Sequence, residues 1–145
     1  MNEVGFVEGR NVTFEHRAAG NEYDRFRAMA DYLVRRQVAA IFANGGTAAA
    51  LAAKAATSTI PIFFYMGGDP VRQGVVGSID RHCGNITGLA WLGIELGAKR
   101  PELLGELLPN VTVIAMLVNP NNPDTELELR DVQEVVRSQG GACLS

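Results

Sequence analysis

The sequence predicts an α/β fold built on parallel strands. Three runs of almost uninterrupted apolar residues, 38–43, 60–66 and 112–118, have the length and composition of strands buried on both faces. Segments of helical character separate them, which indicates strand–helix–strand units with right-handed crossovers. Each run ends at a loop rich in Gly or Asn. Because ligands in such sheets bind beyond the carboxyl ends of the strands, we expect a site at these loops.

The segment 38–71 is the centre of this pattern. Its first strand stops at Asn44-Gly45-Gly46-Thr47, where Thr47 is placed to cap a helix over residues 48–57 that is almost pure alanine. Its second strand stops at Gly67-Gly68-Asp69-Pro70. Both loops follow parallel strands, so we expect them at the same edge of the sheet.

Upstream of this unit the sequence predicts one strand and one helix. Residues 11–17 alternate between apolar and polar, which predicts a half-buried strand near a sheet edge. Asp24 is the expected N-cap of a helix that runs to about residue 37. Five apolar side chains with helical spacing predict the buried stripe of that helix. They are Phe26, Met29, Ala30, Leu33 and Val34.

The segment that follows the central unit is less regular. Residues 71–79 are expected to be helical or irregular, and residues 86–91 to form a short strand. A helix is expected over residues 94–108, but an interior proline removes a hydrogen bond and clashes with the preceding turn. Pro101 therefore requires either a kink or a fresh helix start near that residue.

The last part of the chain predicts one more strand–helix unit and the start of another strand. Asn122 as N-cap and Pro123 at the first position mark a helix that runs to about residue 139, where Gly140-Gly141 ends it. Residues 142–144 begin a further strand. One strand and one helix cannot cover both faces of that strand, so we expect partner strands to be missing and sheet edges to be unpaired.

Composition indicates one ordinary globular unit. The chain has 145 residues, 47% of them hydrophobic and 20% charged, with a net charge of −3. Without a basic run, a nucleic-acid-binding face is not expected. No apolar stretch reaches the roughly 18 residues of a membrane span, and no signal peptide is visible. Cys83 and Cys143 lack metal-site spacing, so we expect two free thiols.

A search for catalytic motifs finds none. His16 and His82 are the only histidines, and no nucleophile elbow, zinc-binding helix or Cys-x-x-Cys pair is present. The loop 44–47 is neither a Walker loop nor a dinucleotide fingerprint. We therefore expect no catalytic residues, no metal site and no cofactor.

Three loops at strand ends carry groups that suit a polar ligand. The loop 44–47 offers backbone N–H groups and a hydroxyl for a carboxylate or another small anion, or it is simply a glycine turn with a capped helix. Asp69 would receive an ammonium or hydroxyl group, or it forms the turn before Pro70. The amide-rich loop 119–122 would bind polar groups, or it caps the next helix.

Seven short motifs, in order, cover essentially the whole chain and resemble the ABC-transporter substrate-binding proteins of the tryptophan/tyrosine-binding type. The resemblance implies a type I periplasmic binding protein, in which ligand binds between two lobes that each contain a parallel, Rossmann-like α/β sheet. It also implies that this chain is truncated at both ends. The motifs are residues 5–12, 43–47, 60–62, 67–71, 84–88, 95–100 and 118–120.

The resemblance divides the chain into two parts and assigns a binding site. Residues 1–90 would form the first lobe without its first strand and helix, and residues 91–145 the beginning of the second lobe. The two lobes would contribute facing walls of one cleft. The first wall would contain Asn44, Gly46, Thr47 and Asp69, and the second Asn119 and Asn121.

By the same resemblance the full protein captures a small polar ligand, an amino acid or related carboxylate, without catalysis. Its partner is the permease of an ABC transporter, and its location is the periplasm or cell envelope. Without a visible signal peptide, the chain as given would stay in the cytoplasm. Unpaired sheet edges would also allow a homodimer.

Two other functions share this fold class. The chain would serve as the ligand-sensing domain of a transcription regulator if a DNA-binding segment preceded it. It would be a small flavodoxin-like enzyme if the loop 45–47 bound a phosphate, although no catalytic set accompanies that loop. Fold alone does not choose among these functions.

Overall fold

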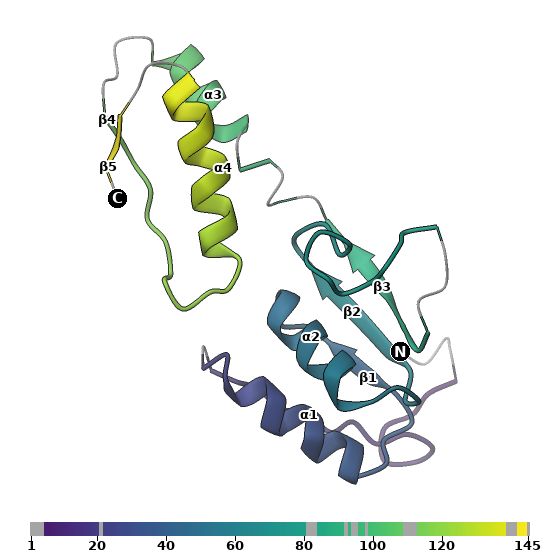
Figure 1. Cartoon of the computed structure of the whole chain (residues 1–145). Coiled ribbons are helices and arrows are strands. Elements are labelled where there is room, and N and C mark those ends of the chain that lie inside the picture. Colours follow the sequence, from purple (N-terminus) through teal and green to yellow (C-terminus); the bar gives the residue numbers. More distant parts are fainter. Residues whose placement is uncertain are drawn as a thin grey trace.

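The computed structural model describes residues 5–20, 22–80, 84–91, 93, 96–97, 99–108, 113–138 and 142–144. These residues form two α/β bodies that lie side by side (Figure 1). The N-terminal body contains α1 (Arg25–Arg35), β1 (Ile41–Ala43), α2 (Gly46–Ala56), β2 (Ile62–Met66) and β3 (Ile86–Ala90). The C-terminal body contains α3 (Lys99–Leu107), β4 (Val113–Ala115), α4 (Thr125–Ser138) and β5 (Ala142–Leu144).

Each body has its own parallel sheet, as the apolar runs predict. In the N-terminal body the strand order is β1-β2-β3, and Ile62 of β2 is in register with Ile41 and Ile86 on its two sides. In the C-terminal body β4 pairs with β5, which confirms the strand expected at residues 142–144. The predicted parallel α/β architecture is therefore confirmed.

The core of the N-terminal body lies between its sheet and α2. Ile62, Phe64 and Met66 of β2 are each at most 3% exposed, and Ala50 and Ala53 of α2 pack against them. The small alanine side chains let the helix approach the sheet closely, and full burial of a residue such as Ile62 stabilises the fold by about 1.5–3 kcal/mol. Helix α1 adds Phe26, Leu33 and Val34 to the edge of this cluster.

The sheet of the N-terminal body is covered on one face only. Burial alternates strictly along β2, so that the side chains between the core residues point away from the helices. The expectation of strands buried on both faces is wrong for the described residues, because α1 and α2 join the same core cluster. We call the opposite surface the bare face. It consists of Phe42, Phe63, Tyr65 and Leu89, which are 43–63% exposed, and the rings of Phe42 and Phe63 lie 5.7 Å apart.

Gly88 of β3 is required by its close approach to β2. A Cβ atom at residue 88 would lie 2.2 Å from the backbone oxygen and 2.7 Å from the backbone nitrogen of Phe64, its partner in register. Backbone atoms of a buried strand have little room to move, so a larger residue would push the two strands apart.

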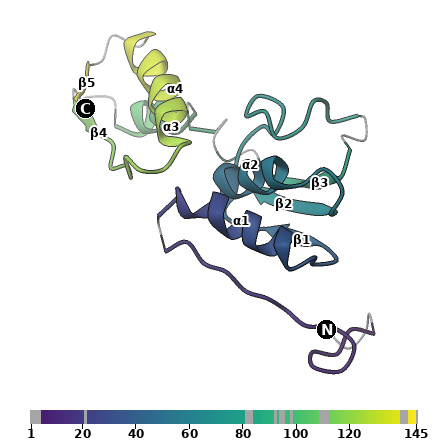
Figure 2. The same cartoon turned by 60° about the horizontal axis from the view of Figure 1, so that its bottom comes forward.

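The predicted strand at residues 11–17 is wrong. The segment 5–20 contains only an isolated bridge between Glu8 and Val12, and Phe14 is 53% exposed. Figure 2 shows this segment running beside α1, apart from the sheet. A strand needs a neighbour to satisfy its backbone groups, and no described strand pairs with the outer edge of β1.

Glu15 instead ties this segment to α1. Tyr32 Oη donates to Glu15 Oε1 at 2.9 Å, and the Arg17 guanidinium donates to the same oxygen at 2.7 Å while lying 4.3 Å from the Tyr32 ring centre. The hydrogen bond from Tyr32, together with that from Arg17 and the charge of Arg36, outweighs partial desolvation and lowers the pKa of the Glu15 carboxyl.

Two helix starts in the N-terminal body differ from the sequence prediction. Asp24 is the N-cap residue of α1, but its side chain makes no capping hydrogen bond. Thr47 does not cap α2, because the helix begins at Gly46 and its N-cap is Gly45. The Phe26 ring packs so closely on Gly45 that a Cβ there would lie 2.6 Å from the ring, which leaves no space for a capping side chain.

The C-terminal body follows the predicted order with shorter elements. Helix α3 begins at Lys99, which places Pro101 in its first turn and favours a fresh start there over a kinked longer helix. Strand β4 ends at Ala115, before the predicted end at residue 118, because β5 pairs only with residues 113–115. The predicted glycine stop at residues 140–141 and both cysteine thiols lie outside the described residues.

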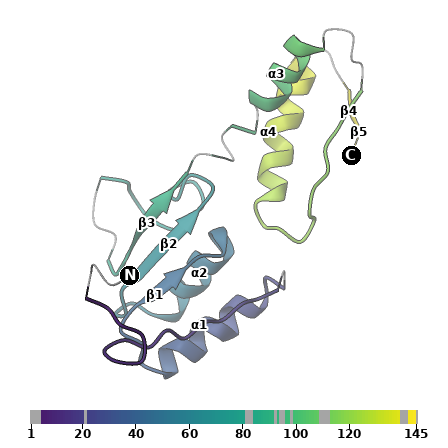
Figure 3. The ribbon, with the colours of Figure 1, turned by 180° about the vertical axis from the view of Figure 1, so that it is seen from behind.

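Helix α4 buries Val132 and Val136, four residues apart on one side of the helix. It begins at Thr125, two residues after Pro123. The Asn122 side chain accepts a hydrogen bond from the Asp124 backbone N–H at 3.1 Å and so stabilises the turn before the helix. The predicted N-cap position at Asn122 is wrong, because the helix starts two residues later than Pro123. Figures 1 and 3 show the start of α4 turned toward the N-terminal body. None of the described helices has the length and apolarity needed to cross a membrane.

Candidate ligand-binding site

Thr47 lies at the carboxyl edge of the sheet and is 6% exposed. Its hydroxyl donates to Gln73 Oε1 at 2.7 Å instead of capping α2. Gln73 belongs to the loop that follows β2, so the two strand-end loops of the N-terminal body meet through this contact. The hydrogen bond between Thr47 and Gln73 confirms the expectation that these loops share one edge of the sheet.

Asp69 shapes the loop that carries Gln73. Its Oδ1 accepts hydrogen bonds from the backbone N–H groups of Val71 at 2.7 Å and Arg72 at 3.2 Å. Its backbone oxygen accepts from the Gln73 N–H at 3.0 Å. This is the turn-forming role weighed as the alternative for Asp69, and it fixes the direction in which Gln73 leaves the sheet.

The C-terminal body reaches this edge through Asp124. Gln73 Nε2 donates to Asp124 Oδ1 at 3.2 Å, and Asp124 Oδ2 lies 3.9 Å from the position that a Cβ on Gly46 would occupy. Gly46 has a φ of +69°, a left-handed conformation that favours glycine. Gly46 thus turns the chain into α2 and leaves the start of the helix open to the carboxylate of the other body.

A second contact joins the same loop to α4. The Arg72 guanidinium donates to both carboxylate oxygens of Asp131, each at 3.3 Å. The side chains of Arg72 and Asp131 are 47% and 22% exposed, so water and salt screen the pair. Residues 72 and 73 together carry two contacts between the bodies, one charged and one based on an amide.

The remaining predicted site residues lie around this contact without joining it. Asn44 is exposed just after β1. Asn119 Oδ1 accepts from the Asn121 backbone N–H at 3.1 Å, and the Asn119 backbone oxygen accepts from the Thr125 hydroxyl at 2.8 Å. Asn119 and Asn121 therefore hold the shape of the loop that presents Asp124, and both are exposed.

Sequence reasoning missed Gln73 and Asp124, although they connect the two bodies. Gln73 lies in the segment 71–79, which the sequence predicts only as helical or irregular, and Asp124 follows the predicted helix start at Asn122 and Pro123. The available signal was position, since both residues lie close to loops already singled out at strand ends. Their proximity to each other depends on how two separate sheets are placed, which no local pattern contains.

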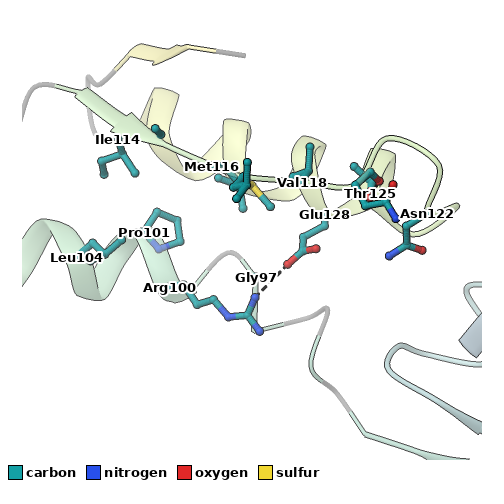
Figure 4. Close-up of a pocket in the computed structure, with 14 residues that line it drawn as sticks. Gly97, Arg100, Pro101, Leu104, Ile114, Met116, Val118, Asn122, Thr125 and Glu128 are labelled. Atoms are coloured by element: carbon teal, nitrogen blue, oxygen red, sulfur yellow. Dashed lines mark hydrogen bonds and ion pairs between the residues drawn. The ribbon is translucent and has the colours of Figure 1, made fainter. Parts of the chain in front are cut away.

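A pocket of about 370 Å³ opens in the C-terminal body between α3, α4 and the residues that follow β4 (Figure 4). Pro101 and Leu104 face Ile114 and Met116 across it, and Arg100 is joined to Glu128 at 3.0 Å. Asn119, Asn122 and Thr125 also line it. Its volume lies within the range of small-molecule sites, about 300–1,000 Å³, and it adjoins the loop that presents Asp124.

The chemistry available at this edge is hydrogen bonding and charge. Hydroxyl, amide and carboxylate groups lie here, and no group of three or more His, Cys, Asp or Glu side chains in the described part of the chain could hold a metal ion. Trp91 adds an aromatic group, since its indole packs 3.2 Å from the position of a Cβ on Gly67 and is 55% exposed.

The model of one protein family, described as ABC transporter substrate binding protein, matches residues 1–140. The chain belongs to this family. The tyrosine-binding protein of Clostridioides difficile (strain R20291) is 26% identical over 138 residues, which is 94% of this chain but 39% of that protein. The resemblance that the sequence motifs carry is thereby confirmed.

Solved structures share the fold. A conserved domain protein from Vibrio cholerae aligns with a TM-score of 0.81 and 26% identity over 98% of this chain. The ABC domain of a Streptococcus pneumonia protein in complex with L-Trp aligns with a TM-score of 0.74 and 19% identity over 92%. The chain spans 47% and 46% of these two structures, so it corresponds to about half of each.

Proposed function

We propose that this chain forms the ligand-binding edge of the solute-binding component of an ABC transporter. The observation that carries the proposal is the meeting of Thr47 and Gln73 with Asp124, where strand-end loops of one α/β body face a loop of the other. Open α/β sheets bind ligands at such edges. Capture here needs no covalent step, and we propose binding without catalysis.

The ligand class we propose is an amino acid. Its carboxylate would accept from Thr47 and backbone N–H groups near Gly46, and its ammonium would pair with Asp124, with Asp69 and the Asn44 amide nearby. The named relatives support an aromatic side chain, since one is a tyrosine-binding protein and another was solved with L-Trp. The exposed indole of Trp91 offers a stacking surface for such a ring.

The whole protein's organisation follows from the same proposal. Residues 1–90 would belong to the first lobe and residues 91–145 to the second, in agreement with a sheet that ends at Ala90 and a helix that starts at Lys99. Asn119 and Asn121 would form the wall of the second lobe. The partner would be a transporter permease, and the location would be the periplasm or cell envelope.

The test is calorimetric titration of the chain with L-tyrosine, L-tryptophan and inorganic phosphate. We expect one of the amino acids to bind and phosphate not to bind. Thr47→Ala should weaken binding by about 2- to 10-fold, since one hydrogen bond is worth about 0.5–1.5 kcal/mol. Thr13→Ala, on an exposed residue of the N-terminal segment, is the matched control. Binding of phosphate alone would favour a phosphate-binding enzyme and refute the proposal.

A further inference from the structure

We propose that Gln73 couples the ligand site to the relative orientation of the two bodies. Its side chain contacts a residue of each body at the same time, Thr47 on one side and Asp124 on the other. The proposal adds a positioning role for a residue outside the predicted site, and only its ligand-dependent part rests on the proposed function.

The chemistry of the amide fits both partners. Gln73 Oε1 accepts from the Thr47 hydroxyl at 2.7 Å, and Gln73 Nε2 donates to Asp124 Oδ1 at 3.2 Å. A side-chain amide supplies an acceptor and a donor on one planar group. A carboxylate at residue 73 could still accept from Thr47, but it would face the carboxylate of Asp124 without a proton to donate.

The backbone of Gln73 is held firmly to the N-terminal body. Asp69 accepts hydrogen bonds along the loop, and Lys54 Nζ of α2 donates to the Gly74 backbone oxygen at 2.7 Å. Val75, which follows Gly74, is fully buried in the core. The amide of Gln73 therefore extends from an anchored position, and its distance from Asp124 depends on how the bodies are placed.

Asp124 is held to the C-terminal body in a similar way. Its N–H donates to Asn122 Oδ1 at 3.1 Å, and its backbone oxygen accepts from the Glu128 N–H of α4 at 3.1 Å. The bond between residues 73 and 124 thus joins two rigid supports. The ion pair of Arg72 with Asp131 acts between the same loop and α4, so one short loop sets the orientation of one body against the other.

Coupling to ligand follows from the shared use of Thr47. A ligand that accepts from the Thr47 hydroxyl competes for the same donor as Gln73 Oε1, and a ligand ammonium competes with Gln73 Nε2 for Asp124. The Thr47 hydroxyl has one proton, so a ligand that takes it releases Gln73 Oε1, and a ligand ammonium at Asp124 Oδ1 would displace Gln73 Nε2. Through these contacts Gln73 would communicate ligand occupancy to the arrangement of the two bodies.

The test measures orientation directly, by residual dipolar couplings of backbone amides in the free 145-residue chain. We expect the two bodies of the unmodified chain to fit one alignment tensor. Gln73→Glu should give two different tensors, because the carboxylates of residues 73 and 124 repel each other. Adding Asp124→Asn to Gln73→Glu should restore a single tensor. The amide introduced at residue 124 can donate to the carboxylate introduced at residue 73, so the hydrogen bond forms in the opposite direction.

Gln37→Glu is the matched control, since it adds the same charge on an exposed residue at the end of α1. The amide spectrum of the core strands shows whether each variant is folded. The proposal is overturned if Gln73→Glu keeps a single tensor, or if the double variant does not restore it in a folded chain.

A titration with L-tyrosine then separates this inference from the proposed function. We expect Gln73→Glu to weaken binding about tenfold. The double variant is left out of this titration, because Asp124→Asn also removes the carboxylate proposed to pair with the ligand ammonium. Absence of L-tyrosine binding to the unmodified chain would count against the proposed ligand class, while the dipolar couplings would still decide the role of Gln73. Equal affinities of the unmodified chain and Gln73→Glu would refute the coupling.

Discussion

Gly88→Ala tests the closeness of β3 to β2, on which the carboxyl edge of the sheet depends. The added Cβ would lie 2.2 Å from the Phe64 backbone oxygen, well inside contact distance. The two strands are paired over all five residues of β3 and the clash is with backbone atoms, so relief requires a backbone shift and not a change of rotamer. Overpacking of this kind costs about 1–3 kcal/mol, which corresponds to a fall in Tm of roughly 2–12 °C for a chain of this size.

The assay is thermal unfolding followed by far-ultraviolet circular dichroism, with Gly77→Ala as the control. A Cβ at residue 77 would meet no atom within 4 Å, and its φ is not in the left-handed region. We expect the control to keep the Tm of the unmodified chain. Equal melting temperatures for the two variants would show that β2 and β3 do not approach as closely as the register requires, and would refute the reasoning.

Two further predictions concern the N-terminal segment and the bare face. The pKa of the Glu15 carboxyl is lowered in the folded chain, so its stabilising contacts are complete above its ordinary pKa and are lost as the pH falls through the lowered value. Backbone amide shifts of residues near Tyr32 should therefore change over that acidic range, and Glu15→Gln should abolish the change. Phe42→Thr with Phe63→Thr should reduce binding of the dye ANS to the chain, because the two residues are 63% and 43% exposed on the bare face, and should lower the unfolding temperature only slightly. Unchanged dye fluorescence would show that the bare face is covered in solution.

Much of the fold could be predicted because its signals are local. The apolar runs located β1, β2 and β4, the helical spacing of residues such as Leu33 located α1, and the signals around Asn122 and Pro123 located α4. Parallel pairing followed from the alternation of strands and helices. The boundaries were less accurate, because a strand extends only as far as its partner does, and β4 stops where β5 does.

Features that depend on distant partners were not predictable in this way. The alternating pattern of residues 11–17 is suited to a strand, yet a strand forms only where another strand lies beside it. The apolar runs indicated burial on both faces, but only one face of the described sheet has helices packed on it.

Only part of the candidate site could be predicted, because some of its contacts also depend on distant partners. Thr47 and Asp69 were placed at the correct edge of the sheet, because the ends of parallel strands coincide. Their contacts could not be read from the sequence, since Thr47 turns to Gln73 and Asp69 serves its own loop. The meeting of Gln73 with Asp124 spans two bodies, and its prediction would require their relative placement.

The position of Trp91 gives this chain an optical property of its own. It is the single tryptophan of the sequence, and its indole lies against Gly67 where the chain leaves the first sheet and crosses toward α3. Its Nε1 is 3.5 Å from the position of a Cβ on Gly67, and more than half of the side chain is in contact with water. A rotation that moved this indole away from Gly67 or Gly93 would change the hydration of this one fluorophore, so its emission maximum would report such a rearrangement without an added label.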